Sequence, residues 1–338
     1  MKLDFPRTNN LEWLRLLFAV QVAIVHAGEH LGVPMPSIVA HFPGVPAFFF
    51  VSGFLIYASY LNAPGKRYFQ NRFLRLFPGL LFVTLGGAAL MVFALGWDDL
   101  RANLQVYAGW IIGQITLGQA YNPAHFRSVG VGVVNGSLWT ITTEIIFYFS
   151  VPFIVMAERR FRYTVAVLLA ASFAIYAAGP RMWSTPVYRE KTYFDILALT
   201  PLVWGWMFCF GMLAVKHFHS LSRWLKYAPL LLIPMILMGE WGSGPLFGAV
   251  DNRLGLAYFV CYIACALWLA FVVPYVRLRA DFSYGAYVWH MPVVNLLLIL
   301  SLRSVPLAVA GTLAAAAFSW YLVEKPALKL KRSTLKPV

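Results

Sequence analysis

A histidine and an arginine lie eleven residues apart in one apolar segment, LRLLFAVQVAIVHAGEH, residues 14–30. Eleven residues make about three helical turns and a rise of roughly 16 Å, so Arg15 and His26 would share one face at different depths. Ionisable residues inside a membrane usually face a bundle interior or a wet cavity, where a histidine can act as a general base. His26 is therefore the first candidate catalytic residue. The structural alternative is an arginine that reaches the interface and a histidine satisfied by a carbonyl.

A carboxylate at the depth of His26 would complete such a base. In SLWTITTEIIFYF, Glu144 lies about two turns below the expected external end of the fourth apolar segment, which is the depth of His26. A carboxylate can fix the tautomer of an imidazole and stabilise its protonated form. Glu12 is the competing partner, but it lies roughly 21 Å from His26 along the helix and is better placed for Arg15 at i, i+3.

Two residues on other apolar segments are second-tier candidates. Ser52, in FFFVSGFLIY, belongs to the outer half of the second segment beside Gly53, which permits close helix approach. Its alternative role is helix–helix contact. His290, in FSYGAYVWHMPVV, falls near mid-membrane and would either line a cavity or cap a kink at Pro292.

Aromatic residues and a further histidine complete the inventory on the external side. Trp139 and Tyr148 flank Glu144 and are second-tier substrate residues. Rings near this side could stack on sugars, although interface belts explain them equally: Trp110, Tyr121, Trp139, Trp183 and Trp241. His30, at i+4 from His26, has no evident third ligand, so no metal site is expected.

On the opposite side, KRYFQNRFLRLFPG places four basic residues within ten positions. Lys66 and Arg67 are explained by topology and anionic lipid. Arg72 and Arg75 lie at i, i+3 on one helix face, where guanidinium groups can grip phosphates. A phosphorylated cytoplasmic ligand is therefore expected to bind this pair.

The elements that must hold these residues are long apolar blocks. Hydrophobic residues make up 60% of the 338 residues and charged residues only 12%. This composition predicts an all-α polytopic membrane protein that forms one domain over residues 1–338. The first block can span about 30 Å of hydrocarbon, and no cleavage site follows it, so we expect it to remain as an uncleaved anchor.

Blocks of helical length predict about ten transmembrane helices, at residues 11–31, 46–63, 76–96, 137–157, 163–179, 194–215, 227–240, 255–275, 282–301 and 304–323. The connecting segments that this arrangement places inside are basic, as the positive-inside rule requires, so both termini are expected in the cytoplasm. The 27 Lys and Arg against 13 Asp and Glu are assigned to these loops and not to a nucleic-acid partner.

One further apolar stretch, residues 105–120, does not fit this count. Three glycines interrupt it, and a span there would place the basic segment ERRFR outside. We expect a re-entrant or interfacial segment within a long external region, residues 97–136. Such backbone is tolerated only against protein or a water-filled cavity, so this region is expected to line one.

Six motifs together resemble the acyltransferase-3 family of integral membrane O-acyltransferases. They are LEWLR followed by ten residues and His26, then FFFVSGFLI, RFLRLFP, SLWTITTEIIFYF, SYGAYVWHMPV and YLVEKP. They stand in the family's order and cover essentially the whole chain. Two departures are modest: Glu12 stands where many members carry Asp, and VEKP replaces the commoner Glu-Arg-Pro.

The resemblance implies a ten-helix core in a bacterial-type inner membrane. It implies transfer of an acyl group, usually acetyl, from cytoplasmic acyl-CoA to a hydroxyl of an extracytoplasmic glycan or glycolipid. The family's residues map to Arg15 and His26, to the pair Arg72 and Arg75, and to Glu144. Some members carry an additional extracytoplasmic esterase-like domain, and none is expected here.

The residues and the resemblance meet in one mechanism. Arg72 and Arg75 would hold the phosphates of acetyl-CoA, and its pantetheine arm would pass Arg15 to bring the thioester to His26. His26, assisted by Glu144, would deprotonate the acceptor hydroxyl, or would itself be acylated first. The sequence does not choose between these routes, nor does it indicate the acyl group, the acceptor or the oligomeric state.

A different class of function remains open, a polyprenyl-linked glycan flippase or a small-solute transporter. In such a protein the buried charges would be coupling or substrate sites. The sequence carries no paired half-repeats that would support it, and it leaves Arg72 and Arg75 unexplained.

Overall fold

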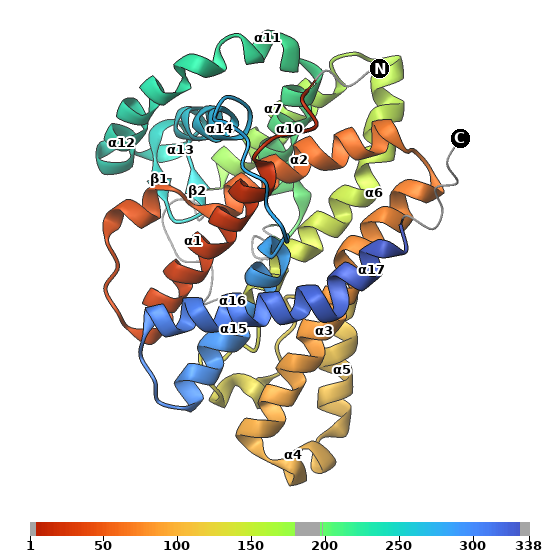
Figure 1. Cartoon of the computed structure of the whole chain (residues 1–338), viewed down its shortest axis with the longest axis vertical. Coiled ribbons are helices and arrows are strands. Elements are labelled where there is room, and N and C mark those ends of the chain that lie inside the picture. The colour runs from red at the N-terminus through yellow and green to blue at the C-terminus, as the bar shows by residue number, and fades with distance from the viewer. Residues whose placement is uncertain (1–4, 180–196, 198, 332–338) are drawn as a thin grey trace. The chain divides into compact units, whose positions relative to one another are not determined.

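The computed structural model describes residues 5–179, 197 and 199–331, and within them the chain is almost entirely helical (Figure 1). The first half contains α1 (Leu11–Leu31), α2 (Gly44–Asn62), α3 (Lys66–Leu95), α4 (Trp97–Ala102), α5 (Leu104–Ile115), α6 (Trp139–Arg160) and α7 (Thr164–Ala178). The second half contains α10 (Pro201–Lys216), α11 (Phe218–Ser222), α12 (Leu232–Trp241), α13 (Gly244–Phe247), α14 (Leu256–Phe271), α15 (Ser283–Ile299), α16 (Val305–Ser319) and α17 (Lys325–Lys329).

Short irregular elements connect these helices. Short 3-10 helices occur at Ser37–His41, Ala124–Ser128, Gly136–Leu138 and Leu225–Leu231, and a π-helical turn at Trp320–Glu324 joins α16 to α17. The described strands are β1 (Ala249–Val250) and β2 (Arg253–Leu254), an antiparallel pair in which Ala249 is opposite Leu254. The α-helical fold class is confirmed.

Most of the predicted spans coincide with one described helix, whereas the span 227–240 covers a 3-10 helix and the ten-residue α12. The first predicted span, residues 11–31, has the same bounds as α1, which begins at Leu11 and ends at Leu31. The third begins earlier than predicted, because α3 continues from the basic segment at Lys66 for 30 residues, a length of roughly 45 Å. The start of the predicted span 194–215 and Trp183 lie outside the described residues.

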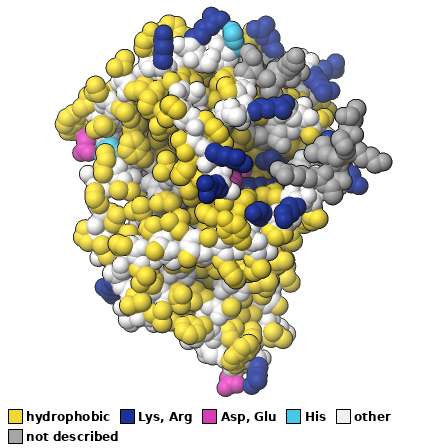
Figure 2. All heavy atoms as spheres, in the orientation of Figure 1, with side chains coloured by type: hydrophobic (Ala, Val, Ile, Leu, Met, Phe, Trp, Pro, Cys, Tyr) yellow, Lys and Arg dark blue, Asp and Glu magenta, His cyan; other side chains and the backbone are white. Residues whose placement is uncertain are grey.

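Five described helical segments are long and apolar enough to cross a bilayer, namely Leu11–Leu31, Ser37–Asn62, Lys66–Leu95, Gly136–Arg160 and Val305–Lys329. Large apolar side chains are exposed on several of them, for example Phe93 at 62% and Phe153 at 66%. Figure 2 shows hydrophobic side chains over most of the visible face. Exposed apolar surface of this extent is expected where helices face lipid.

The chain divides into two compact units. The first comprises Met1–Phe18, Ser37–Gly65 and Ile146–Arg279, and the second comprises Ala19–Pro36, Lys66–Ile145 and Ala280–Val338. Helices α1 and α6 each contribute residues to both units.

In the first unit α10 packs along α2 and α7 (Figure 1). Gly53 on α2 and Gly211 on α10 make this approach possible. A Cβ atom at Gly53 would lie 2.0 Å from the carbonyl oxygen of Phe208, and one at Gly211 would lie 2.1 Å from that of Phe50. The close helix approach predicted at Gly53 is therefore confirmed.

In the second unit an apolar cluster packs the end of α1 against α15 and α16. Its buried members are Ala27, Leu31, Val294, Leu297, Val305 and Ala308. Ala27 directly follows His26, and Val294 lies about one turn after His290. The same cluster that stabilises the unit therefore sets the position of both histidines.

Candidate active site

His26 on α1 and His290 on α15 are in direct hydrogen-bond contact, although 264 residues separate them in the chain. Nδ1 of His26 lies 2.8 Å from Nε2 of His290. The side chain of His290 is fully buried, whereas that of His26 is only partly buried. The structure therefore brings together two of the residues that the sequence singled out.

The backbone of α15 determines which nitrogen carries hydrogen in each ring. Nδ1 of His290 lies 2.6 Å from the carbonyl oxygen of Tyr287 and must donate, because a carbonyl only accepts. In neutral His290, Nε2 is then the acceptor, so Nδ1 of His26 donates to it. Of the four ring nitrogens, Nε2 of His26 is the one whose lone pair is not used in these hydrogen bonds. Within the described part of the chain this atom makes no hydrogen bond to a protein group, so it can serve a substrate.

A proline and an asparagine fix this part of α15. Pro292 has no N–H, so the carbonyl of Val288 loses its partner within the helix. Nδ2 of Asn135 donates to that carbonyl at 2.8 Å, and the hydroxyl of Ser137 donates to Oδ1 of Asn135 at 2.7 Å. The sequence left open whether His290 lines a cavity or accompanies a kink at Pro292. The ring of His290 makes two hydrogen bonds, one to the backbone carbonyl of Tyr287, about one turn before Pro292, and one to His26.

A second asparagine ties residues 129–136, here called the valine–glycine loop, to α15. Oδ1 of the buried Asn295 accepts the backbone N–H of Val131 at 2.8 Å. Its Nδ2 donates to the carbonyls of Val133 and Val134, at 2.9 and 3.0 Å. Gly130 has φ +58°, and a Cβ atom there would lie 1.9 Å from Oδ1 of Asn295. Only glycine satisfies both the backbone conformation and the space.

The predicted phosphate-binding pair lies on the basic part of α3. Arg72 and Arg75 are both partly buried, and a guanidinium nitrogen of Arg75 forms an ion pair with Oδ2 of Asp281. The other oxygen of Asp281 accepts hydrogen bonds from the backbone N–H and the hydroxyl of Ser283, the first residue of α15. Asp281 thus fixes the start of α15 and orients Arg75 with one carboxylate.

In the first unit, the loop that ends at Arg279 lines a cavity of about 550 Å³ through Arg277, Leu278 and Arg279. The N-terminal segment holds this loop, because Oδ1 of Asn10 accepts the backbone N–H of Val276 at 3.0 Å. The basic segment 276–279 is therefore held by a contact with the start of the chain.

The remaining predicted residues divide between the two units. Arg15 and Ser52 are partly buried and Tyr148 is buried in the first unit, whereas Trp139 and Glu144 are partly buried in the second. The pairing of Glu144 with His26 stays a prediction. Of the aromatic set, Trp110 is buried in the core between α3 and α5, while Tyr121 and Trp241 are exposed.

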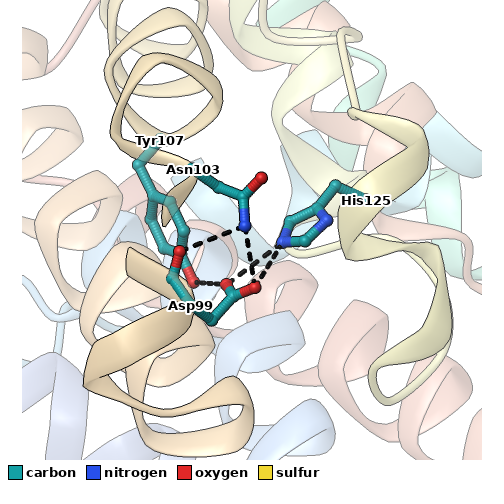
Figure 3. A network of polar contacts seen from close by, with 4 residues as sticks. All are labelled: Asp99, Asn103, Tyr107 and His125. Atoms are coloured by element: carbon teal, nitrogen blue, oxygen red, sulfur yellow. Dashed lines mark hydrogen bonds and ion pairs between the residues drawn. The ribbon is translucent and has the colours of Figure 1, made fainter. Parts of the chain in front are cut away.

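Sequence reasoning missed a network centred on Asp99 (Figure 3). The carboxylate of Asp99 accepts hydrogen bonds from Nε2 of His125 at 2.9 Å, from the hydroxyl of Tyr107 at 2.9 Å and from Nδ2 of Asn103 at 3.0 Å. Asp99, Asn103 and Tyr107 recur at i, i+4 and i+8, a spacing that could have revealed a common helix face. The network joins α4 and α5 to the 3-10 turn that carries His125.

The hydrogen bond from His125 is the main reason why the pKa of Asp99 lies below its usual value. The bonds from Tyr107 and Asn103 act in the same direction. Among the described residues, no group of three or more His, Cys, Asp or Glu side chains has an arrangement suited to a metal ion.

Comparison with known proteins places the chain. The family model described as "Acyltransferase domain" matches residues 8–324. The chain belongs to the acyltransferase-3 family. Nodulation protein 10 of Rhizobium leguminosarum bv. viciae is 29% identical over 351 residues, which cover 96% of this chain and 94% of that protein.

An O-acetyl transferase of Shigella phage Sf6 is 26% identical over 337 residues, which cover 94% of this chain and 96% of that protein. No solved structure matches the chain significantly. Together with the apolar helices, these similarities identify the protein as a multi-pass membrane acyltransferase.

Proposed function

We propose that the protein transfers an acyl group, acetyl in the first place, from cytoplasmic acyl-CoA to a hydroxyl of an extracytoplasmic glycan or glycolipid. The family membership and the similarity to a protein named O-acetyl transferase support O-acyl transfer. The observation that carries the chemistry is the chain of hydrogen bonds from the Tyr287 carbonyl through His290 to His26. It supplies one oriented basic nitrogen, as general-base catalysis requires.

The proposed reaction uses Nε2 of His26 twice. Nε2 takes the proton of the acceptor hydroxyl while the hydroxyl oxygen attacks the thioester carbonyl. The carbon–sulfur bond then breaks, and the CoA thiolate leaves with the proton that Nε2 returns. His290 keeps His26 in the tautomer that has this lone pair, and Glu144 is proposed to stabilise the protonated form.

Donor binding is assigned to the basic end of α3. Arg72 and Arg75 are proposed to bind the phosphates of acetyl-CoA, because guanidinium groups form paired hydrogen bonds with phosphate oxygens. Arg15 is proposed to face the donor along its path to His26. Second-tier contacts with the substrates are assigned to Ser52, Trp139 and Tyr148. No metal is required by this chemistry.

The membrane arrangement is part of the proposal. We infer ten transmembrane helices with both termini in the cytoplasm of a bacterial-type inner membrane. The basic segments at the predicted inner ends support this orientation, and α5, at 12 residues, is too short to cross the hydrocarbon alone.

The test is CoA release from acetyl-CoA by purified protein in lipid nanodiscs, with candidate glycan and glycolipid acceptors. Wild type should release CoA in step with acceptor acylation, and His26→Ala should not. Normal activity in His26→Ala would overturn the assignment. Acceptor movement without CoA release would favour the flippase or transporter.

A second measurement separates the two chemical routes. Protein mixed with labelled acetyl-CoA alone should form no acyl-protein if the hydroxyl attacks directly. A labelled adduct at His26, found by mass spectrometry after rapid quenching, would show that His26 is acylated first.

A further inference from the structure

A third cationic side chain, Lys331, lies at the end of the described chain, after the helix that packs against α3. Helix α17 packs against α3 in the second unit (Figure 1), and Lys331 follows α17 by two residues. Lys331 is partly buried, whereas Lys329, at the end of α17, is exposed. The two lysines therefore have the same charge and nearly the same sequence position but different environments.

The environment of Lys331 is unfavourable for a positive charge. Burial, followed by the charges of Arg72 and Arg75, lowers the pKa of the Lys331 ammonium to about 8. Helix α17 packs against α3 and runs toward the beginning of α3 (Figure 1), so the chain after α17 continues toward the end of α3 that carries Arg72 and Arg75. The effect of both arginines on the pKa of Lys331 agrees with this placement. An arrangement of like charges is stabilised when an anion binds among them.

Two carboxylates lie beside α3, one just before α15 and one at the end of the π-helical turn. Asp281 pairs with Arg75, and it also caps the start of α15 through Ser283. Glu324 packs beside Gly79, one turn beyond Arg75, where its Cγ is 3.4 Å from a Cβ placed on that glycine. Three cations against two carboxylates leave a positive excess even when both acids are counted.

We propose that Lys331 is a third ligand of the CoA phosphates and completes an anion site whose other cations are Arg72 and Arg75. The inference rests on the proposed function, because it takes acyl-CoA as the donor. Asp281 holds Arg75 from one side, and a guanidinium group can donate to more than one oxygen at once. Lys331 contributes a point charge from a different element, so donor binding joins α3 to the end of α17.

The experiment measures CoA affinity by calorimetry for the full chain in nanodiscs of neutral phosphatidylcholine. The variants are Lys331→Gln, Lys331→Arg and the matched control Lys329→Gln. We expect Lys331→Gln to weaken CoA binding about tenfold, because it removes a charge-assisted contact with phosphate. Lys331→Arg should stay within about threefold of wild type, and Lys329→Gln should be unchanged.

A donor without phosphates separates binding from folding. Acetyl-pantetheine should be used equally by wild type and Lys331→Gln, because it has no group for Lys331 to bind. An equal loss with both donors, or equal CoA affinity in Lys331→Gln and Lys329→Gln, would overturn the inference while leaving the proposed function intact. If wild type neither bound CoA nor released it from acetyl-CoA, both proposals would fail.

Phosphate chemistry is also offered by anionic lipid headgroups, and a second arm distinguishes that source. CoA affinity is measured again in nanodiscs that contain phosphatidylglycerol, and retained lipid is counted by native mass spectrometry. If Lys331 bound the phosphate of a lipid headgroup instead, Lys331→Gln would lose bound phosphatidylglycerol and would keep its CoA affinity in neutral nanodiscs. That result would overturn the inference.

Discussion

Two histidines of the second unit have hydrogen-bond partners of opposite character. His26 contacts another imidazole, that of the buried His290, whose Nε2 accepts a hydrogen bond from Nδ1 of His26. His125 contacts the carboxylate of Asp99, which also accepts from Tyr107 and Asn103. The first arrangement leaves a basic nitrogen in a defined direction. The second satisfies a charge and joins segments of the chain.

The difference shows why a histidine alone indicates little about function. An imidazole partner that is itself fixed by a carbonyl selects one tautomer without adding charge. A carboxylate partner with several donors gives a stable junction, and the Asp99–His125 contact lies where both side chains are partly exposed. Catalysis is therefore expected to depend on the first pair and stability on the second.

The largest contrast is expected between His26→Gln and His125→Gln. Loss of the basic nitrogen should reduce kcat for acetyl transfer by about a thousandfold or more, because general-base catalysis commonly supplies 10²–10⁴-fold. His125→Gln should stay within about threefold of wild type. CoA release at saturating acetyl-CoA measures both, and equal losses in the two variants would remove the distinction between the pairs.

The second contrast concerns His290 as a positioning residue. His290→Leu removes the acceptor for Nδ1 of His26, so kcat should fall roughly 10- to 100-fold with little change in the KM for acetyl-CoA. His290→Gln offers an amide oxygen at a similar reach and should recover part of the rate. A rise in KM with unchanged kcat would instead show that His290 contributes to donor binding.

The third prediction concerns the valine–glycine loop. Gly130→Ala should lower the free energy of unfolding by about 2 kcal/mol or more, because a residue with φ +58° must also place Cβ against Asn295. Thermal unfolding in detergent measures this loss. Gly130→Ala combined with Asn295→Ala should be less destabilised than the sum of the single variants. Strict additivity would contradict the steric argument.

The smallest effect is expected at Asp99. Its pKa is lowered in the folded state, so the carboxylate contributes stability above its ordinary pKa near 4, and this contribution is lost as pH falls through the lowered value. Asp99→Asn should therefore lower the unfolding midpoint by a few degrees at pH 7 and approach wild type below about pH 4. A constant difference at all pH values would show that charge is not involved.

The helices could be predicted closely because apolar length is a local property. The first predicted span agrees with α1 at both ends. In residues 105–120, α5 includes Gly109 and Gly113 and ends at Ile115 after 12 residues, and its place in the membrane stays a prediction. The start of α3 was placed ten residues late, at 76 instead of Lys66. Basic residues lowered the local hydropathy there, although the backbone continues as one helix.

The site could be predicted only in its parts. The helical spacing from Arg15 pointed to His26, and the expected position of His290 near mid-membrane pointed to that residue. The contact between the two histidines spans 264 residues of sequence and depends on tertiary packing, which hydrophobic periodicity does not encode. Asn135 and Asn295 were missed because the sequence position of an asparagine does not reveal which backbone group its side chain satisfies. The signal that could have found Asn135 is Pro292, which leaves one carbonyl in need of a donor.

The hydrogen bond from Asn135 to Val288 also bears on how the chain assembles during synthesis. Ribosomes deliver residue 135 well before α15, so the donor is already present when the proline-interrupted helix enters the bilayer. An interrupted helix that arrived first would expose a bare carbonyl to lipid, at a cost of several kcal/mol. The order of the chain therefore provides the donor for the Val288 carbonyl before α15 inserts, and a swap of these two segments by circular permutation is expected to delay maturation.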